Sequence, residues 1–224
     1  MNNKLNYSYL YSYQDGTYTN ILKCVDVNFG LFALILVAGF IINYKTEDNI
    51  FRTGFTYLAI SIWTYYVHKT MHDYPNTVFG KIHAIHHNPL YKDTISAEIF
   101  EIFVNIIIIG GLFWIPIILI LENQTGFKLA NHHTILIWAL IFTTYHLINY
   151  HVVKHEIHAQ HHVENGINNY GPEWFDILCN TKAEKSEMED MNSVMINIVV
   201  IIFIVLGLKD TPYDLIQILT KLVQ

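Results

Sequence analysis

The stretch from Ile99 to Leu121 limits what this chain can fold into, because it contains a single charged residue, Glu101. A helix of about 20 residues crosses the hydrocarbon core of a bilayer, which is about 30 Å thick. This stretch is therefore long and apolar enough to span a membrane. The composition agrees, since 52% of the 224 residues are hydrophobic and 14% are charged, whereas about 25% of the residues are charged in soluble domains.

Further apolar stretches predict additional membrane helices. They run from about Phe29 to Tyr44, from about Phe55 to Val67 and from Thr134 to about Val153. We therefore predict an all-α integral membrane protein with about four transmembrane helices. A fifth stretch, Val194 to Leu208, is only marginally long enough, and it either spans, tilts or lies in the membrane interface.

The ends of the chain differ from this apolar region. Residues 1–23 are rich in Asn, Tyr and Ser and lack the features of a signal peptide, so they predict a polar N-terminal tail. Residues 24–208 then form a membrane-embedded domain, and residues 209–224 form a short C-terminal tail. The charged run Lys182 to Asp190 is interpreted as a solvated linker or helix face. The net charge of −6 provides no electrostatic basis for binding nucleic acid.

Most of the 13 histidines lie in two segments, residues 67–96 and 154–193. These segments face the same side of the membrane if the second, third and fourth apolar stretches each cross it once. The sequence therefore predicts a histidine-rich helical cap on one membrane face, while the counts of Lys and Arg leave its orientation open. His132 and His133 lie in the connection on the opposite side, and we interpret them as surface or interfacial residues.

The histidines of the two segments are arranged in three short motifs. In HKTMH two histidines are four residues apart, which places both on one face of a helix. The pattern H-x-x-H-H occurs twice, in HAIHH and HAQHH, whereas roughly 0.001 such coincidences are expected by chance. Neutral imidazole is the commonest metal ligand. The motif histidines are therefore candidate metal ligands: His68, His72, His83, His86, His87, His158, His161 and His162.

The number of these histidines favours two metal ions, because one first-row ion accepts only about four to six ligands. Nitrogen-rich coordination suits Fe, Zn, Cu or Ni, and it excludes Ca and Mg, which need oxygen ligands. Cys24 and Cys179 match no metal spacing. Three more histidines are candidate ligands, namely His146 within the fourth apolar stretch and His151 and His155 on the helical face of the last motif. The last two could instead orient other ligands.

These motifs resemble those of the integral-membrane fatty acid hydroxylase and sterol desaturase superfamily, whose members carry H-x(3–4)-H followed by two H-x-x-H-H histidine boxes. The similarity covers roughly residues 60–181. It includes Asn169, Tyr170 and Gly171, and the stretch WFDILCNT from Trp174 to Thr181. Glu101 stands where the family often has a histidine after the second box, which is a departure from the family pattern.

The resemblance implies a non-haem di-iron centre, ligated by the motif histidines, that activates O₂ for oxidation of a lipid C–H bond. His146 and His151 match the additional histidines that family members carry on the last transmembrane hairpin. Zinc can replace iron at such nitrogen sites in purified protein. No segment resembles a haem or flavin domain, so the family analogy adds a separate electron donor, a cytochrome b5 or a ferredoxin with its reductase.

We therefore predict an oxidoreductase that hydroxylates or desaturates a fatty acyl chain or a sterol. It would lie in the endoplasmic reticulum of a eukaryote or the inner membrane of a bacterium. The alternative is a histidine-rich transition-metal transporter or binding protein. Transporters place their ligands near the bilayer midplane, whereas these motifs lie just outside the apolar stretches. A membrane zinc hydrolase would need a general-base carboxylate beside its histidines, and the sequence has no H-E-x-x-H motif.

Acidic and aromatic residues near the motifs have further interpretations. Glu98, Glu101 and Glu156 are possible acceptors for imidazole N–H groups. Glu98 and Glu101 could equally mark the start of the third apolar helix, where acidic residues are favoured. Trp174 and Asp176 are interpreted as structural residues, an amphipathic anchor and a turn or capping acid.

Overall fold

The structure is a computed structural model that describes residues 16–87, 94–148, 152, 161, 168–183 and 187–223. Within these residues the chain is all-helical, without β-strands, which confirms the predicted all-α class. The α-helices in chain order are α2 (Thr17–Val27), α3 (Phe29–Thr46), α4 (Ile50–Asp73), α5 (Val78–His87), α6 (Ile95–Val104), α7 (Trp114–Thr125), α8 (His132–Leu147), α10 (Glu173–Leu178), α11 (Met195–Leu208) and α12 (Leu215–Val223).

Three helical segments in the described ranges are long and apolar enough to cross a membrane: Phe29–Thr46, Ile95–Thr125 and Met191–Leu208. The first two correspond to the first and third predicted spans, and the last corresponds to the marginal fifth stretch. The second and fourth predicted spans are not among them, because α4 is long but rich in polar residues and α8 has only 16 residues. The structure therefore supports three candidate spans, and the predicted count of about four is not confirmed.

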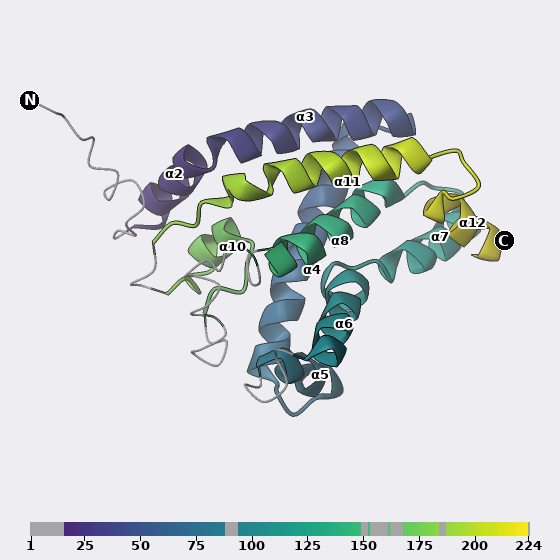
Figure 1. The fold of residues 1–224 in the computed structure, drawn as a ribbon. Coiled ribbons are helices and arrows are strands. Elements are labelled where there is room, and N and C mark those ends of the chain that lie inside the picture. The colour runs from purple at the N-terminus through teal and green to yellow at the C-terminus, as the bar shows by residue number, and fades with distance from the viewer. Residues whose placement is uncertain are drawn as a thin grey trace, which may run out of the picture.

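The segment Ile95–Thr125 is not one uninterrupted α-helix. α6 passes into a π-helical turn, Asn105–Ile109, and residues 110–113 change the direction of the chain before α7 begins (Figure 1). Gly111 has a φ of +75°, which glycine adopts readily, and a Cβ there would collide with the side chain of Ile60. This glycine therefore allows α6 and α7 to leave the turn in different directions.

The packing of the long helices brings the C-terminal ends of α4 and α8 to the same end of the molecule. α3 and α11 lie side by side, α8 packs on α11, and α4 contacts α3, α5 and α8 (Figure 1). Their shared apolar core includes Leu31 of α3, Ile60 of α4 and Ile198 of α11. The C-terminal ends of α4 and α8 both lie near α10, so that His68 and His146 line one cavity.

Helices also form in the two segments that were predicted as tails. α2 packs on α10, with Lys23 and Cys24 buried, and α12 packs on α7. The domain boundaries after residues 23 and 208 stay predictions, but packed helical structure lies on both sides of each.

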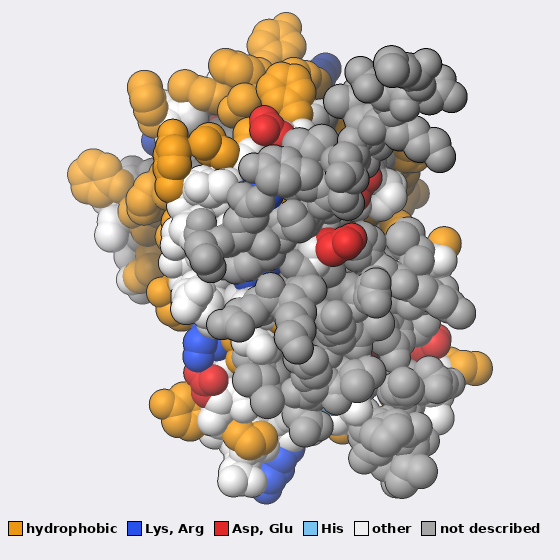
Figure 2. Space-filling view, turned by 90° about the vertical axis from the view of Figure 1, so that its left-hand side faces the viewer, with side chains coloured by type: hydrophobic (Ala, Val, Ile, Leu, Met, Phe, Trp, Pro, Cys, Tyr) orange, Lys and Arg blue, Asp and Glu red, His pale blue; other side chains and the backbone are white. Residues whose placement is uncertain are grey.

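Large apolar side chains are exposed on the candidate spans. They include Phe29, Leu36, Phe40 and Tyr44 on α3, and Ile196 and Phe203 on α11. In Figure 2, hydrophobic side chains gather along the upper and left-hand margins of one face. Soluble proteins rarely expose large contiguous apolar patches, so these surfaces suit contact with lipid.

Candidate metal centre

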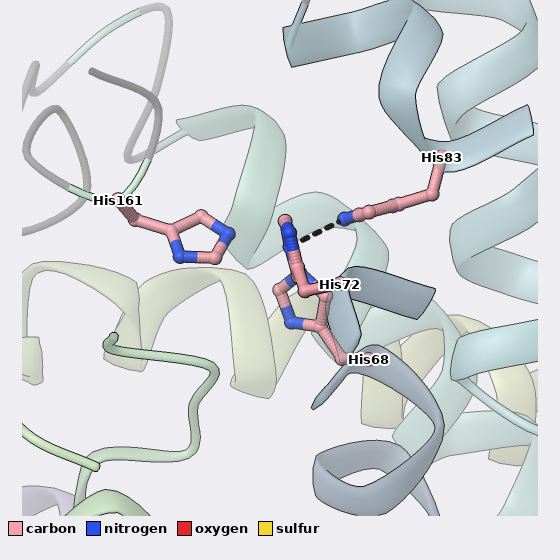
Figure 3. Close-up of side chains that lie close together, drawn as sticks. All are labelled: His68, His72, His83 and His161. Carbon is pink, nitrogen blue, oxygen red and sulfur yellow. Dashed lines mark hydrogen bonds between the residues drawn. The ribbon is translucent and has the colours of Figure 1, made fainter. Parts of the chain in front are cut away.

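Four histidines converge at one end of the molecule. His68 and His72 come from the last turns of α4, His83 comes from α5, and His161 lies beyond α8 in the sequence. The atoms that they can offer to a metal lie within 4.8 Å of one another. Figure 3 shows the four rings gathered around a common centre. His72 is half-buried and the other three are buried.

A tight connection brings the histidines of α4 and α5 together. Gly80, near the start of α5, lies against the turn that follows α4, where a Cβ would collide with the backbone of Tyr74 and Pro75. Because glycine has no Cβ, α5 can pack directly on the end of α4. The Nε2 atoms of His72 and His83 are consequently 2.8 Å apart.

The Nε2 atoms of the cluster face one another. Those of His68 and His72 are 3.3 Å apart, and so are those of His83 and His87. Nitrogen ligands lie about 2.0–2.1 Å from an ion such as zinc, so ligand atoms that share one ion are about 3 Å apart. The spacing of these atoms therefore suits metal binding, and His87 lies at the edge of the same group.

Backbone carbonyl groups fix the orientation of two rings. Nδ1 of His68 lies 2.7 Å from the carbonyl oxygen of Tyr170, and Nδ1 of His161 lies 2.7 Å from that of Asn168. A carbonyl oxygen only accepts hydrogen bonds, so Nδ1 donates and each Nε2 keeps a lone pair for a metal. Ligating histidines are commonly held in this way. The segment 168–171 therefore orients ligands from two separate parts of the chain.

The environment favours neutral imidazoles. Burial, followed by the charges of His161 and His72, lowers the pKa of His68 well below its ordinary value. Burial lowers the pKa of His72 to about 4 and, together with the charge of His72, lowers the pKa of His161 to about 3. The three rings are therefore neutral near pH 7, which is the form that binds metal.

Asp176 holds the segment that carries these carbonyl groups. Its Oδ1 accepts hydrogen bonds from the backbone N–H of Tyr170 at 2.9 Å and from the hydroxyl of Thr181 at 2.7 Å. Its Oδ2 accepts a third from the N–H of Gly171 at 2.6 Å. Burial raises the pKa of Asp176 to about 7. The residue interpreted as a turn or capping acid thus fixes the backbone that orients His68.

Two charged residues of the run Lys182 to Asp190 are buried, contrary to the predicted solvated linker or helix face, whereas Glu187 is exposed. Lys182 is buried, and its Nζ lies 2.6 Å from Oε1 of Glu173. Glu189 is also buried and accepts a hydrogen bond from the hydroxyl of Tyr145 at 2.5 Å. The composition of the run could not reveal these contacts, because the partners come from other parts of the chain. Residues 184–186 lie outside the described residues.

His146 lies beside the cluster. Its Nε2 is 2.7 Å from Oε1 of Glu101, and both side chains are buried. Glu101 was interpreted from the sequence as an imidazole acceptor or as a helix-start acid, and in the structure its carboxylate lies against the ring of His146. Glu98, which is half-buried, occupies the first turn of α6.

Several predicted ligands fall outside the described part of the chain. The backbone of His86 lies in α5, but its side chain is not described. The other predicted site residues outside the described ranges are His151, His155, His158, His162 and Glu156. The described part of the centre therefore consists of both histidines of the first motif, His83 and His87 of the second motif, and His161 of the third motif.

The interpretation of His132 and His133 as surface residues is wrong, because both side chains are largely buried, while their interpretation as interfacial residues stays a prediction. Nε2 of His132 lies 3.2 Å from Oε2 of Glu122, and Nε2 of His133 lies 3.6 Å from Oδ1 of Asp214. Their side chains are 8% and 12% exposed. The prediction failed because it considered only their position in a short connection, whereas their acidic partners come from α7 and from the turn before α12.

An apolar cavity of about 300 Å³ lies between α3, α4, α8 and α11. Gly39 and Gly54 line it, and nothing lies within 4 Å of the position that a Cβ would occupy at either glycine. A cavity of about 150 Å³ can hold benzene, so this space is large enough for part of a hydrocarbon chain. Two of its walls belong to the candidate spans.

The comparisons with known proteins agree with the position of the histidines. The model of the family described as fatty acid hydroxylase matches residues 53–181. This region contains all three histidine motifs, Glu101, His146 and the segment held by Asp176. Comparison with curated proteins and with solved structures gave no match.

Proposed function

This chain belongs to the fatty acid hydroxylase family, and we propose that it oxidises a C–H bond of a membrane lipid at a di-iron centre held by its histidines. Membership of the family implies an oxidoreductase-type enzyme. The observation that carries the proposal is the convergence of His68, His72, His83 and His161 within 4.8 Å at one end of the helical bundle.

The donor set fits a redox-active transition metal. Imidazole nitrogen suits iron, whereas calcium and magnesium require oxygen ligands. The carbonyl groups of Asn168 and Tyr170 leave Nε2 of His161 and His68 available. The predicted ligands outside the described residues would complete the two sites. Bound iron would supply the activation of O₂ that amino-acid side chains cannot provide.

The surrounding residues orient the ligands and place apolar side chains beside the centre. The core beside the cluster is apolar and includes Met71, Val104 and Phe142, so it would limit the access of bulk water to a bound metal. The substrate is a fatty acyl chain or a sterol, and the apolar cavity between α3 and α11 supports a hydrocarbon ligand. The oxidation is a hydroxylation or a desaturation.

The electrons come from a separate protein in this proposal. Hydroxylation by O₂ inserts one oxygen atom into the C–H bond and reduces the other to water, which consumes two electrons and two protons. Desaturation needs the same electrons, because it reduces both oxygen atoms while it removes two hydrogens from the lipid. A cytochrome b5 or a ferredoxin with its reductase would supply them. We place the enzyme in the endoplasmic reticulum of a eukaryote or the inner membrane of a bacterium, as a multi-pass protein.

The proposal is tested by metal analysis and lipid comparison with the full chain. We expect about two irons per chain in purified wild-type protein, and a new hydroxyl group or double bond in the lipids of cells that express it. His161→Ala should lose the bound iron and the lipid product. His133→Gln changes a histidine at the N-terminal end of α8, away from the metal centre, and this variant should keep the iron and the product.

Two results would count against this proposal. A folded wild-type protein that binds no metal would contradict the proposal. Metal uptake into proteoliposomes that is independent of O₂ and of an electron donor would instead support the alternative, a transition-metal transporter.

A further inference from the structure

We propose that the carboxylate of Glu101 is itself a metal ligand, and that with His146 it holds the metal ion beside the four-histidine cluster. The inference rests on the proposed function, because it assigns a residue of the same centre. It starts from the 2.7 Å separation between Oε1 of Glu101 and Nε2 of His146. Their side chains are 4% and 6% exposed, so the contact is shielded from solvent.

The pair lies next to the histidine cluster on two sides. Glu101 and His83 line one small cavity, between α5 and α6. His146 and His68 line another, of about 40 Å³, between the ends of α4 and α8. Since α5 packs on both α4 and α6, Glu101 and His146 lie next to the histidines of α4 and α5.

The separation of the two atoms suits ligands of one ion. The Nε2 atoms within the cluster are 2.8–3.3 Å apart, and the contact between Glu101 and His146 is of similar length. His146 presents to Glu101 the same ring nitrogen, Nε2, that the cluster histidines present to one another. A carboxylate oxygen binds first-row metals at about 2.0–2.2 Å, nearly the same distance as imidazole nitrogen.

Charge supplies a second argument. A buried carboxylate is costly unless a positive charge or a metal compensates it. The described residues that line the cavity beside Glu101 include no lysine or arginine, so the nearby groups that could compensate its charge are imidazoles, those of His83 and His146. Two divalent ions bound only by neutral imidazoles would in turn place four uncompensated positive charges in the protein. A single carboxylate at this position reduces both costs.

A different role for Glu101 gives a different experimental result. The carboxylate could only orient His146, by accepting a hydrogen bond from Nε2–H. Glutamine has the same shape and still accepts that hydrogen bond, but its neutral amide is a much weaker ligand for iron. Glu101→Gln therefore separates ligation from orientation.

The experiment measures iron in purified full-length variants, together with their Mössbauer spectra. We expect Glu101→Gln to fall from about two irons per chain to about one, with the loss of one spectroscopic species. Glu101→His should keep about two, because imidazole can replace the carboxylate as a ligand. Glu98→Gln, a change of a half-buried acid one turn earlier in α6, is the matched control and should retain the wild-type content.

The outcomes distinguish this inference from the proposed function. If wild-type protein binds about two irons and Glu101→Gln binds as many, with an unchanged spectrum, Glu101 is not a ligand. If Glu101→Gln does not fold, the Mössbauer spectrum of folded Glu101→His decides the question, because exchange of an oxygen ligand for a nitrogen ligand should change the signal of one iron, and an unchanged spectrum would contradict ligation at this position. If wild-type protein binds no metal, it is the proposed function that fails.

Discussion

At the scale of single residues, the metal centre depends on atoms that are not ligands. The carbonyl oxygens of Asn168 and Tyr170 determine which nitrogen of His161 and His68 faces the cluster. Asp176 in turn accepts hydrogen bonds from the backbone next to those carbonyls. A defect in this support would misorient the histidines without removing any of them.

Asp176→Asn tests this support. The asparagine Nδ2 cannot accept the hydrogen bond from the N–H of Gly171, so the segment 168–171 should loosen. Loss of a group that orients ligands typically lowers metal affinity by about 10–100-fold, and we expect a decrease of this size in competition with a chelator. Thr181→Val removes only one of the hydrogen bonds to Asp176, so it should have a smaller effect. An Asp176→Asn variant with wild-type affinity would contradict the role assigned to the loop.

At the scale of secondary structure, the sequence predicted contacts within a helix much better than contacts between helices. The spacing of His68 and His72 places them on one face of any helix, and both lie in the cluster. The contact between Glu101 and His146 depends on how α6 and α8 are placed, and the break at Gly111 sets the direction of α6. The burial of His132 depends likewise on Glu122 of α7. These contacts depend on the angles at which the helices pack, and a pattern along the sequence does not contain those angles.

The apolar cavity provides an element-scale prediction about the substrate. A leucine at Gly54 of α4 would project into open space in this cavity. We expect Gly54→Leu to shift the products toward lipids with shorter chains, or to lower the yield if the chain length is fixed. The measurement is the product profile in cells that express the variant.

The Gly54→Leu variant can be checked for correct folding and compared with a control variant. Leucine is favoured over glycine in a helix by about 1 kcal/mol, so Gly54→Leu should unfold at a temperature no lower than wild type. Gly207→Leu in α11 is the matched control, since its Cβ also meets nothing and Gly207 does not line the cavity. An unchanged product profile for Gly54→Leu would show that the substrate does not occupy this space.

At the scale of the whole molecule, hydropathy alone leaves the number of membrane crossings open. Length and composition identify three candidate spans, whereas the predicted arrangement needs α4 and α8 to cross as well. α8 has 16 residues and so covers about 24 Å, a little less than a hydrocarbon core of about 30 Å. Its two ends carry His132 and His146, so its orientation decides whether the metal centre and the His132 contact lie on opposite membrane faces.

Thiol labelling measures this orientation with little change to the protein. Cys179 is exposed and lies just after α10, near the metal centre, whereas Cys24 is fully buried. Burial, followed by the charge of Glu173, also raises the pKa of the Cys24 thiol, and a protonated thiol reacts slowly with a maleimide. A membrane-impermeant maleimide should therefore report on Cys179 alone in wild-type protein.

A second thiol at the other end of α8 completes the test. Phe127, between α7 and α8, is 73% exposed, so Phe127→Cys in a Cys179→Ser background supplies an accessible site. In sealed vesicles of one orientation we expect the reagent to label Cys179 and the Phe127→Cys thiol from opposite sides, because the crossing count places residues 122–133 opposite the histidine motifs. Labelling of both from the same side would mean that α8 does not cross the membrane. Detergent-solubilised protein, in which both thiols should react, shows whether each site is accessible in the fold.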